Sequence, residues 1–179
     1  MRLVKTLPFL LSLSAALGSA SALALPNDRD QPIRIQADNA QLDDKKGIAT
    51  YTGDVIITQG SMMIKGNTVT ITRSASGDID VVTSVGNLAY FEQQQSAAKP
   101  DKMQGYAVQI QYQALKDLVV LTDRAKVINE GNTTEGEKIV YNTKSQVATA
   151  GRGSNITAPR PRIDMVIQPK SKPAEQQAQ

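Results

Sequence analysis

The side chains that could carry out chemistry in this chain are acids, hydroxyls and amines, because its 179 residues include no His and no Cys. A histidine general base, thiol chemistry, a disulfide framework and every Cys/His zinc site are therefore excluded. A serine nucleophile would need a lysine as its base. The chain contains no Gly-x-Ser-x-Gly motif and no glycine-rich phosphate loop. Serine-hydrolase and nucleotide-dependent activities are not indicated.

Three pairs of acids remain as candidates, Asp43-Asp44, Asp78-x-Asp80 and Glu135-x-Glu137. The two acids of a glycosidase face one cleft about 5 to 9 Å apart, whereas these pairs lie in or beside predicted turns. The segment 78–80 also lacks the other ligands of a calcium loop. We therefore expect no metal, no cofactor and no enzymatic activity. A polysaccharide-active enzyme is the alternative that an ordered cluster of acids in one cleft would support.

The elements that hold these side chains are predicted to be strands. After residue 30 the chain is rich in Val, Ile and Thr, which favour the pleated surface of a sheet, and apolar residues alternate with polar ones instead of forming a helical stripe. Turn residues separate the alternating runs at 44–47, 59–61, 65–67, 76–78, 86–87, 130–132 and 136. This spacing predicts an antiparallel all-β sandwich or barrel of about 12 to 16 short strands.

A weak repeat runs through these strands. The segment 53–59, Gly-Asp-Val-Ile-Ile-Thr-Gln, resembles segments 86–92 and 123–129, at spacings of 33 and 37 residues. Each has turn residues, then apolar side chains two positions apart, then a polar end. Such a period is typical of stacked units that bury their apolar faces against their neighbours. It predicts an elongated, solenoid-like sandwich, with chance similarity among β-rich segments as the alternative.

Both ends of the chain are predicted to lie outside the folded domain. Residues 1–24 combine two basic residues, an apolar run and an Ala-Leu-Ala site, which is the layout of a cleavable signal peptide. We expect 25–32 to be a flexible entry, 33–168 the domain and 169–179 a disordered polar tail. Residues 25–158 carry 14 basic and 15 acidic groups, so the formal charge of +3 lies elsewhere. No basic surface for nucleic acid is predicted.

The interior of the domain is predicted to be aliphatic, because the chain has two Phe, five Tyr and no Trp. An aliphatic lining suits alkyl chains and is a poor platform for stacking bases, which again argues against nucleic acid. Composition alone leaves two possibilities open, a filled sandwich core and an apolar groove.

Five segments together resemble a known family. They are 33–38 (IRIQAD), 51–60 (YTGDVIITQG), 69–73 (VTITR), 105–112 (GYAVQIQY) and 117–122 (DLVVLT). Their order and spacing over residues 31–168 resemble the OstA-like domain of the LptA family, the periplasmic lipopolysaccharide-transport proteins of Gram-negative bacteria. The loop 129–132 departs from the family pattern.

The resemblance implies an open β-jellyroll in the periplasm whose apolar groove shields the lipid A acyl chains of lipopolysaccharide. It also implies a bridge from an inner-membrane OstA-like transport component to the outer-membrane translocon. Motif matching assigns lipid contact to Ile33, Ile35, Phe91 and Tyr112. The alternation of apolar residues adds Val55, Ile57 and Leu121. A secreted structural or adhesive β-solenoid without lipid cargo is the alternative.

Self-assembly is expected at the terminal strands. An open sandwich leaves unpaired backbone N–H and C=O groups at its first and last strands. Pairing the C-terminal edge of one protomer with the N-terminal edge of the next would satisfy both, and such a head-to-tail contact need not close into a ring. The candidate residues are Ile33, Ile35, Arg73 by motif match, Ile163, Met165 and Ile167.

Overall fold

The computed structural model describes residues 28–96, 99–151 and 162–169. Within these ranges the chain forms ten strands and two 3-10 helices, without any α-helix. In chain order the elements are η1 (Asp28–Asp30), β1 (Ile33–Gln36), β2 (Asn39–Asp43), β3 (Ile48–Gln59), β4 (Met62–Arg73), β5 (Ile79–Ser96), β6 (Lys99–Gln113), η2 (Ala114–Lys116), β7 (Leu118–Asn129), β8 (Asn132–Asn142), β9 (Val147–Gly151) and β10 (Asp164–Val166). The expected signal peptide and most of the expected polar tail lie outside the described residues.

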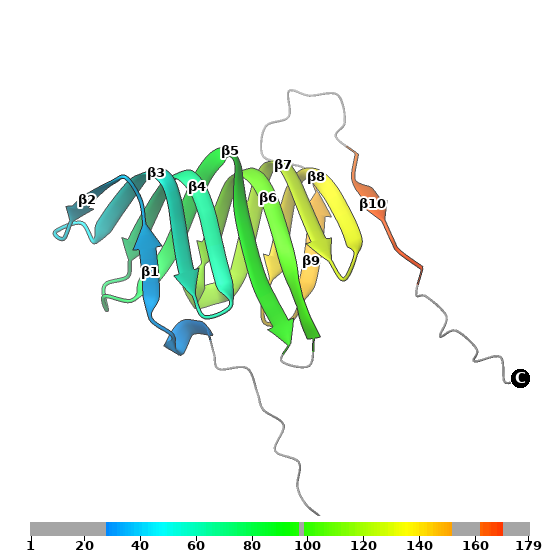
Figure 1. Cartoon of the computed structure of the whole chain (residues 1–179), viewed down its shortest axis with the longest axis horizontal. Coiled ribbons are helices and arrows are strands. Elements are labelled where there is room, and N and C mark those ends of the chain that lie inside the picture. The colour runs from blue at the N-terminus through cyan, green and yellow to red at the C-terminus, as the bar shows by residue number, and fades with distance from the viewer. Residues whose placement is uncertain (1–27, 97–98, 152–161, 170–179) are drawn as a thin grey trace, which may run out of the picture.

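All ten strands belong to one open antiparallel sheet, which confirms the all-β fold class. The order is β1-β3-β4-β5-β6-β7-β8-β10, with β2 also paired to β3 and β9 also paired to β8. Figure 1 shows the strands stacked side by side, with β1 and β2 at one end and β8, β9 and β10 at the other. No described helix has the length and apolar character needed to cross a membrane.

The long strands bend at a column of register shifts. These shifts lie between Thr52 and Val55, Lys65 and Thr68, Val85 and Ala89, Tyr106 and Gln109, and Thr122 and Ala125. Bulges bend a strand and increase its local twist. The single sheet therefore folds over along this column into two layers, which we call the β1 layer, ending in β1 and β10, and the β2 layer, ending in β2 and β9.

The bends account for both the repeat and the number of strands. The three repeat segments begin at 53–54, 86–87 and 123–124, the bends of β3, β5 and β7. Turn signals at 65–67, 86–87 and 136 likewise fall inside β4, β5 and β8 instead of between strands. The strands are therefore up to 18 residues long. Ten of them cover a length for which the spacing of turn residues predicted about 12 to 16 short strands.

The core lies between the two layers. The aromatic rings of Phe91, in the β1 layer, and Tyr112, in the β2 layer, have centroids 6.2 Å apart. A Cβ added to Gly105 would lie 2.9 Å from Cδ2 of Leu121 on the opposite layer. Phe91 and Leu121 are both 0 % exposed. The middle of the interior is therefore filled by side chains.

Candidate functional site

An apolar cavity of ≈ 250 Å³ lies between the two layers near the β1 end of the sheet. We call it the N-edge cavity. Its lining comes from both layers and from the two 3-10 helices, and consists of Arg29, Ile33, Ile57, Gln59, Met62, Ile71, Asp78, Ile79, Val82, Tyr112, Ala114 and Leu115. Ile33 and Leu115 are 38 % and 57 % exposed, so the cavity reaches the surface. Most of the lining side chains are aliphatic, and the polar ones are those of Arg29, Gln59, Asp78 and Tyr112.

The cavity opens on the side of the molecule away from the bends. The β1 layer ends there at the turn 59–61, and the β2 layer ends there at η2. Helix η1 lies across this opening. It falls within residues 25–32, which we expected to be a flexible entry, and its described residues make hydrogen bonds to both layers.

Asp28 joins η1 to the β1 layer. Its carboxylate accepts hydrogen bonds from the Ser61 backbone N–H (2.7 Å), the Ser61 hydroxyl (2.8 Å) and Gln93 Nε2 (2.7 Å). Gln59 Nε2 donates to the carbonyl oxygen of Gln31 at 3.1 Å. Gly60 permits this approach, because it has φ +58° and an added Cβ would lie 2.3 Å from Asp28 Oδ1.

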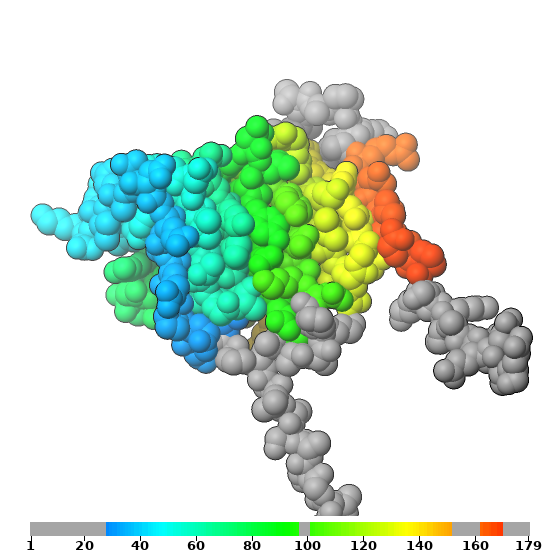
Figure 2. All heavy atoms as spheres, in the orientation of Figure 1, coloured from blue at the N-terminus to red at the C-terminus, as the bar shows by residue number. Residues whose placement is uncertain are grey.

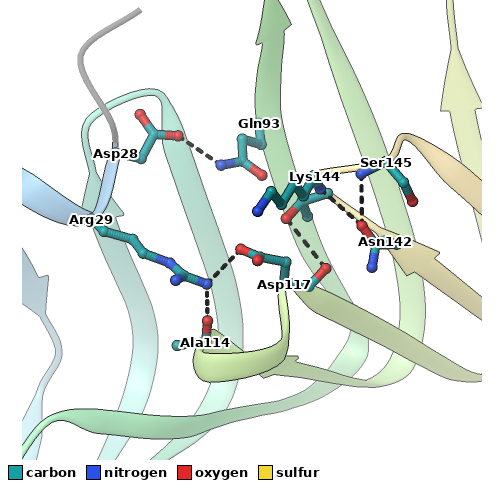
Figure 3. Close-up of polar contacts among 9 residues, drawn as sticks. Asp28, Arg29, Gln93, Ala114, Asp117, Asn142, Lys144 and Ser145 are labelled. Atoms are coloured by element: carbon teal, nitrogen blue, oxygen red, sulfur yellow. Dashed lines mark hydrogen bonds and ion pairs between the residues drawn. The ribbon is translucent and has the colours of Figure 1, made fainter.

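Arg29 joins η1 to the β2 layer. Its Nη2 lies 2.5 Å from Oδ1 of Asp117 and also donates to the carbonyl oxygen of Ala114. Asp117 follows η2 with φ 56°, and its own carbonyl accepts a hydrogen bond from the Thr143 N–H at 2.8 Å. The hydrogen bond to Asp117 raises the pKa of Arg29 above its ordinary value. Figure 3 shows the Asp28 side chain directed toward Gln93 and the Arg29 side chain directed toward Asp117 and Ala114.

A second polar link joins the layers farther along the open side. Gln95 Nε2, in the β1 layer, donates to the hydroxyl of Tyr141 in the β2 layer. Gln146 Nε2 donates to the Gln95 carbonyl at 3.1 Å. Burial raises the pKa of Tyr141, so this hydroxyl is a neutral partner. The link lies beyond the N-edge cavity, whose lining includes none of these three residues.

The structure distributes the seven predicted lipid-contact residues over two environments. Ile33, Ile57 and Tyr112 line the N-edge cavity. The other four belong to the packed interior: Ile35 packs against the core, and Val55, Phe91 and Leu121 are buried within it.

Sequence reasoning missed most of the cavity lining. Met62, Ile71, Ile79 and Val82 also line it, and the alternation that identified Ile57 applies equally to them. Arg29 had no signal of its own, since it lies in a short polar segment outside any periodic run.

The predicted assembly residues lie at or near the two ends of the sheet. Ile33 and Ile35 lie on β1, and Met165 lies on β10 with Ile163 and Ile167 beside it. In Figure 2, β1 and β10 occupy opposite ends of the face in view. Ile163, Met165 and Ile167 are 48 %, 57 % and 70 % exposed, so an exposed run of large apolar side chains occupies this edge. Arg73 lies at the end of β4 and lines a second cavity together with Leu42 of β2.

The candidate acids do not form one site. Asp43 accepts a hydrogen bond from the backbone N–H of Lys46 in one turn, and Asp78 accepts one from the hydroxyl of Ser76 in another. Glu135 of β8 forms an ion pair with Lys126 of β7, with 2.9 Å between Oε1 and Nζ. The described residues include no group of three or more potential metal-ligating acids.

One Ser-x-x-Lys spacing, Ser96 to Lys99, spans the β5–β6 hairpin. Ser96 and Lys99 are Cα partners on the two strands of this hairpin, whereas the residues of a helical Ser-x-x-Lys pair lie about one turn apart. The motif therefore lies on a β-hairpin and not on a helix.

Comparison with known proteins identifies the family. Residues 34–147 match the family model described as LptA/(LptD N-terminal domain) LPS transport protein. The chain is 60 % identical over 174 residues to the lipopolysaccharide export system protein LptH of Pseudomonas aeruginosa, covering 96 % of this chain and 99 % of that one. It is 36 % identical over 155 residues to LptA of Escherichia coli K12, covering 85 % and 83 % of the two chains.

A solved structure agrees with these sequence relationships. The crystal structure of LptH from Pseudomonas aeruginosa, described as the LptA-homologous periplasmic component of the lipopolysaccharide transport device, superposes with a TM-score of 0.75 at 57 % identity. The match covers 80 % of this chain and 100 % of that one. The OstA-like resemblance found in the motifs is therefore confirmed, and the chain belongs to the LptA/(LptD N-terminal domain) family of lipopolysaccharide transport proteins.

Proposed function

We propose that this protein binds lipopolysaccharide in the periplasm by taking lipid A acyl chains between its two layers, and carries it from an inner-membrane OstA-like component toward the outer-membrane translocon. The N-edge cavity is the observation that carries the proposal, because it opens an aliphatic interior to the surface in a member of a lipopolysaccharide transport family. Each exposed CH₂ of an acyl chain costs about 0.8 kcal/mol in water. A continuous apolar path removes this cost without any catalytic step or cofactor.

The size of the cavity defines how cargo would enter. Pockets that hold drug-sized ligands are about 300 to 1,000 Å³, whereas the N-edge cavity is ≈ 250 Å³. A lipid with several acyl chains therefore requires the layers to part. No backbone hydrogen-bond ladder joins the two layers on their open side among the described strands. Parting them exchanges apolar side-chain contacts for contacts with acyl chains.

Strand direction supports head-to-tail assembly. All pairings in the sheet are antiparallel, and eight strands lie on the path from β1 to β10. With an even number of alternating strands, β1 and β10 run in opposite directions. Simple stacking of a second copy would therefore place its β10 antiparallel to β1, and its β9 antiparallel to β2, so both layers would continue across the junction. The exposed apolar side chains of Ile163, Met165 and Ile167 would be covered there.

Site-specific photo-crosslinking to lipopolysaccharide tests the cargo site. A photoreactive residue at Tyr112, which lines the cavity, should crosslink to lipid A. Gln111 is the matched control, because successive residues of a strand face opposite sides and Gln111 therefore faces outward. Ile33 and the exposed Arg34 give a second pair on β1. Equal crosslinking at Tyr112 and Gln111, or none at either, would overturn the proposal and favour a structural β-solenoid with a filled core.

A further inference from the structure

Helix η1 is attached to the two layers in unequal ways. On the β1 layer, the Asp28 carboxylate accepts three hydrogen bonds, two from Ser61 and one from Gln93, and all are partly buried. On the β2 layer, the contacts to Asp117, Ala114 and the Tyr112 hydroxyl all come from the side chain of Arg29, and those to Asp117 and Ala114 are exposed. The contacts of Arg29 should therefore break before those of Asp28.

The Arg29 contacts are suited to reversible breakage. The side chains of Arg29 and Asp117 are 38 % and 30 % exposed, so water can replace each partner at little cost. A lipid phosphate offers the Arg29 guanidinium another anionic partner, with the bidentate geometry that arginine prefers. The phosphate of a lipid at the opening can thus replace Asp117 as the anionic partner of Arg29.

The position of η1 gives these contacts a consequence for the cavity. Arg29 itself lines the N-edge cavity, between Ile33 and Ile57 of one layer and Ala114 and Leu115 of the other. While Arg29 holds η2, the two layers are joined across the opening. The second link, through Gln95 and Tyr141, lies beyond the cavity lining. Releasing Arg29 would therefore free the β1 end of the open side first.

We propose that η1 is a releasable strap across the N-edge cavity, which stays attached through Asp28 and opens when Arg29 leaves Asp117 and Ala114. The strap makes entry of an acylated, phosphate-bearing lipid depend on this one side chain. This inference rests on the proposed lipid-binding function, since it concerns access to the same cavity.

A reversible crosslink tests the strap directly, because the chain has no native cysteine. In the variant R29C/D117C, a short bis-methanethiosulfonate reagent joins the strap to the β2 layer, and a reductant removes it. The probe is purified lipopolysaccharide, and loading is measured as the time course of photo-crosslinking from position 33, because Tyr112 is itself a partner of Arg29. We expect the joined protein to crosslink no more than the Arg34 control. Loading should return after reduction.

Single variants supply a second arm that does not depend on the cysteine pair folding correctly. R29A removes both exposed contacts and should raise the initial loading rate about two- to fivefold, the factor that corresponds to an ion pair of this exposure. R29K keeps the charge and should load more slowly than R29A. K126A, which removes the similarly exposed ion pair with Glu135 on β7 and β8, is the matched control and should load at the wild-type rate.

The possible outcomes separate the two proposals. If the joined and reduced proteins load at the same rate, or if R29A loads no faster than K126A, the strap proposal is wrong while lipid binding stands. If no protein crosslinks to lipopolysaccharide in any state, the proposed function is wrong and the strap proposal falls with it. Circular dichroism of each variant establishes that a loss of loading reflects the cavity and not unfolding.

Discussion

The contact between Gly105 and Leu121 allows the packing of the two layers to be measured. Leu121 is 0 % exposed, so Leu121→Ala should lower the free energy of unfolding by about 2 to 5 kcal/mol. Gly105→Ala places a methyl group 2.9 Å from Leu121 Cδ2. Overpacking of this kind costs about 1 to 3 kcal/mol. If the two positions were independent, the double variant would lose about 3 to 8 kcal/mol.

The double variant should lose less than this sum. The new methyl group of Gly105→Ala fills part of the space that Leu121→Ala leaves, so the two changes compensate one another by about 0.5 to 3 kcal/mol. Urea denaturation followed by circular dichroism gives the four free energies. Gly151→Ala combined with Leu121→Ala is the control, because an added Cβ at Gly151 meets no atom within 4 Å. Additivity of the Gly105 and Leu121 changes within about 0.5 kcal/mol would refute the face-to-face packing of the layers.

Three further predictions concern the edges and the outer surface. Ile35→Asp puts a carboxylate where β1 packs against the core, so lipid crosslinking should fall while the circular dichroism spectrum is kept; a folded variant that loads normally would remove Ile35 from the groove. Deletion of 163–179 removes β10 and should leave a monomer, and an unchanged particle size in light scattering would contradict pairing at this edge. Partial burial raises the pKa of Glu92, but hydrogen bonds from Lys102 and Tyr90 lower it more, so the net pKa lies below its ordinary 4.5. The resulting stabilisation is present above pH 4.5 and is lost as the pH falls through the lowered pKa of Glu92. Glu92→Gln should therefore reduce the loss of unfolding free energy at acid pH, measured by urea denaturation. An acid loss equal to that of the wild type would contradict the assignment.

Period-two alternation predicted the strands correctly because it reports which face is buried, and this is a local property. Turn chemistry was less informative, since the same residue types serve two purposes. At 59–61 and 130–132 the chain reverses between strands, whereas Gly66 and Gly86 lie at bends inside β4 and β5. At Gly66 an added Cβ would lie 2.2 Å from the hydroxyl of Ser84. Only the neighbouring strand determines whether such a glycine marks a turn or a bend.

The candidate site was predictable in part for the same reason. Alternation identified Ile57 and motif matching identified Tyr112, and the structure adds that both line a cavity. The role of Arg29 could not be predicted, because its partners Ala114 and Asp117 are 85 and 88 residues away in the chain. Contacts that close an opening between layers join segments remote in sequence, and no local pattern encodes them.

The arrangement of polar and apolar contacts bears on how the filled interior would accept the proposed acyl chains. Backbone hydrogen bonds run between neighbouring strands on both sides of the bends, so each layer is held together independently of the other. Contacts between the layers are chiefly aliphatic, as between Leu121 and the Gly105 backbone. Replacing such contacts by acyl chains conserves buried apolar area, so the hydrophobic free energy of the open, loaded state can approach that of the closed one. On the proposed function, the directional bonds across the open side, from Arg29 and Gln95, would then hold the protein without lipid closed.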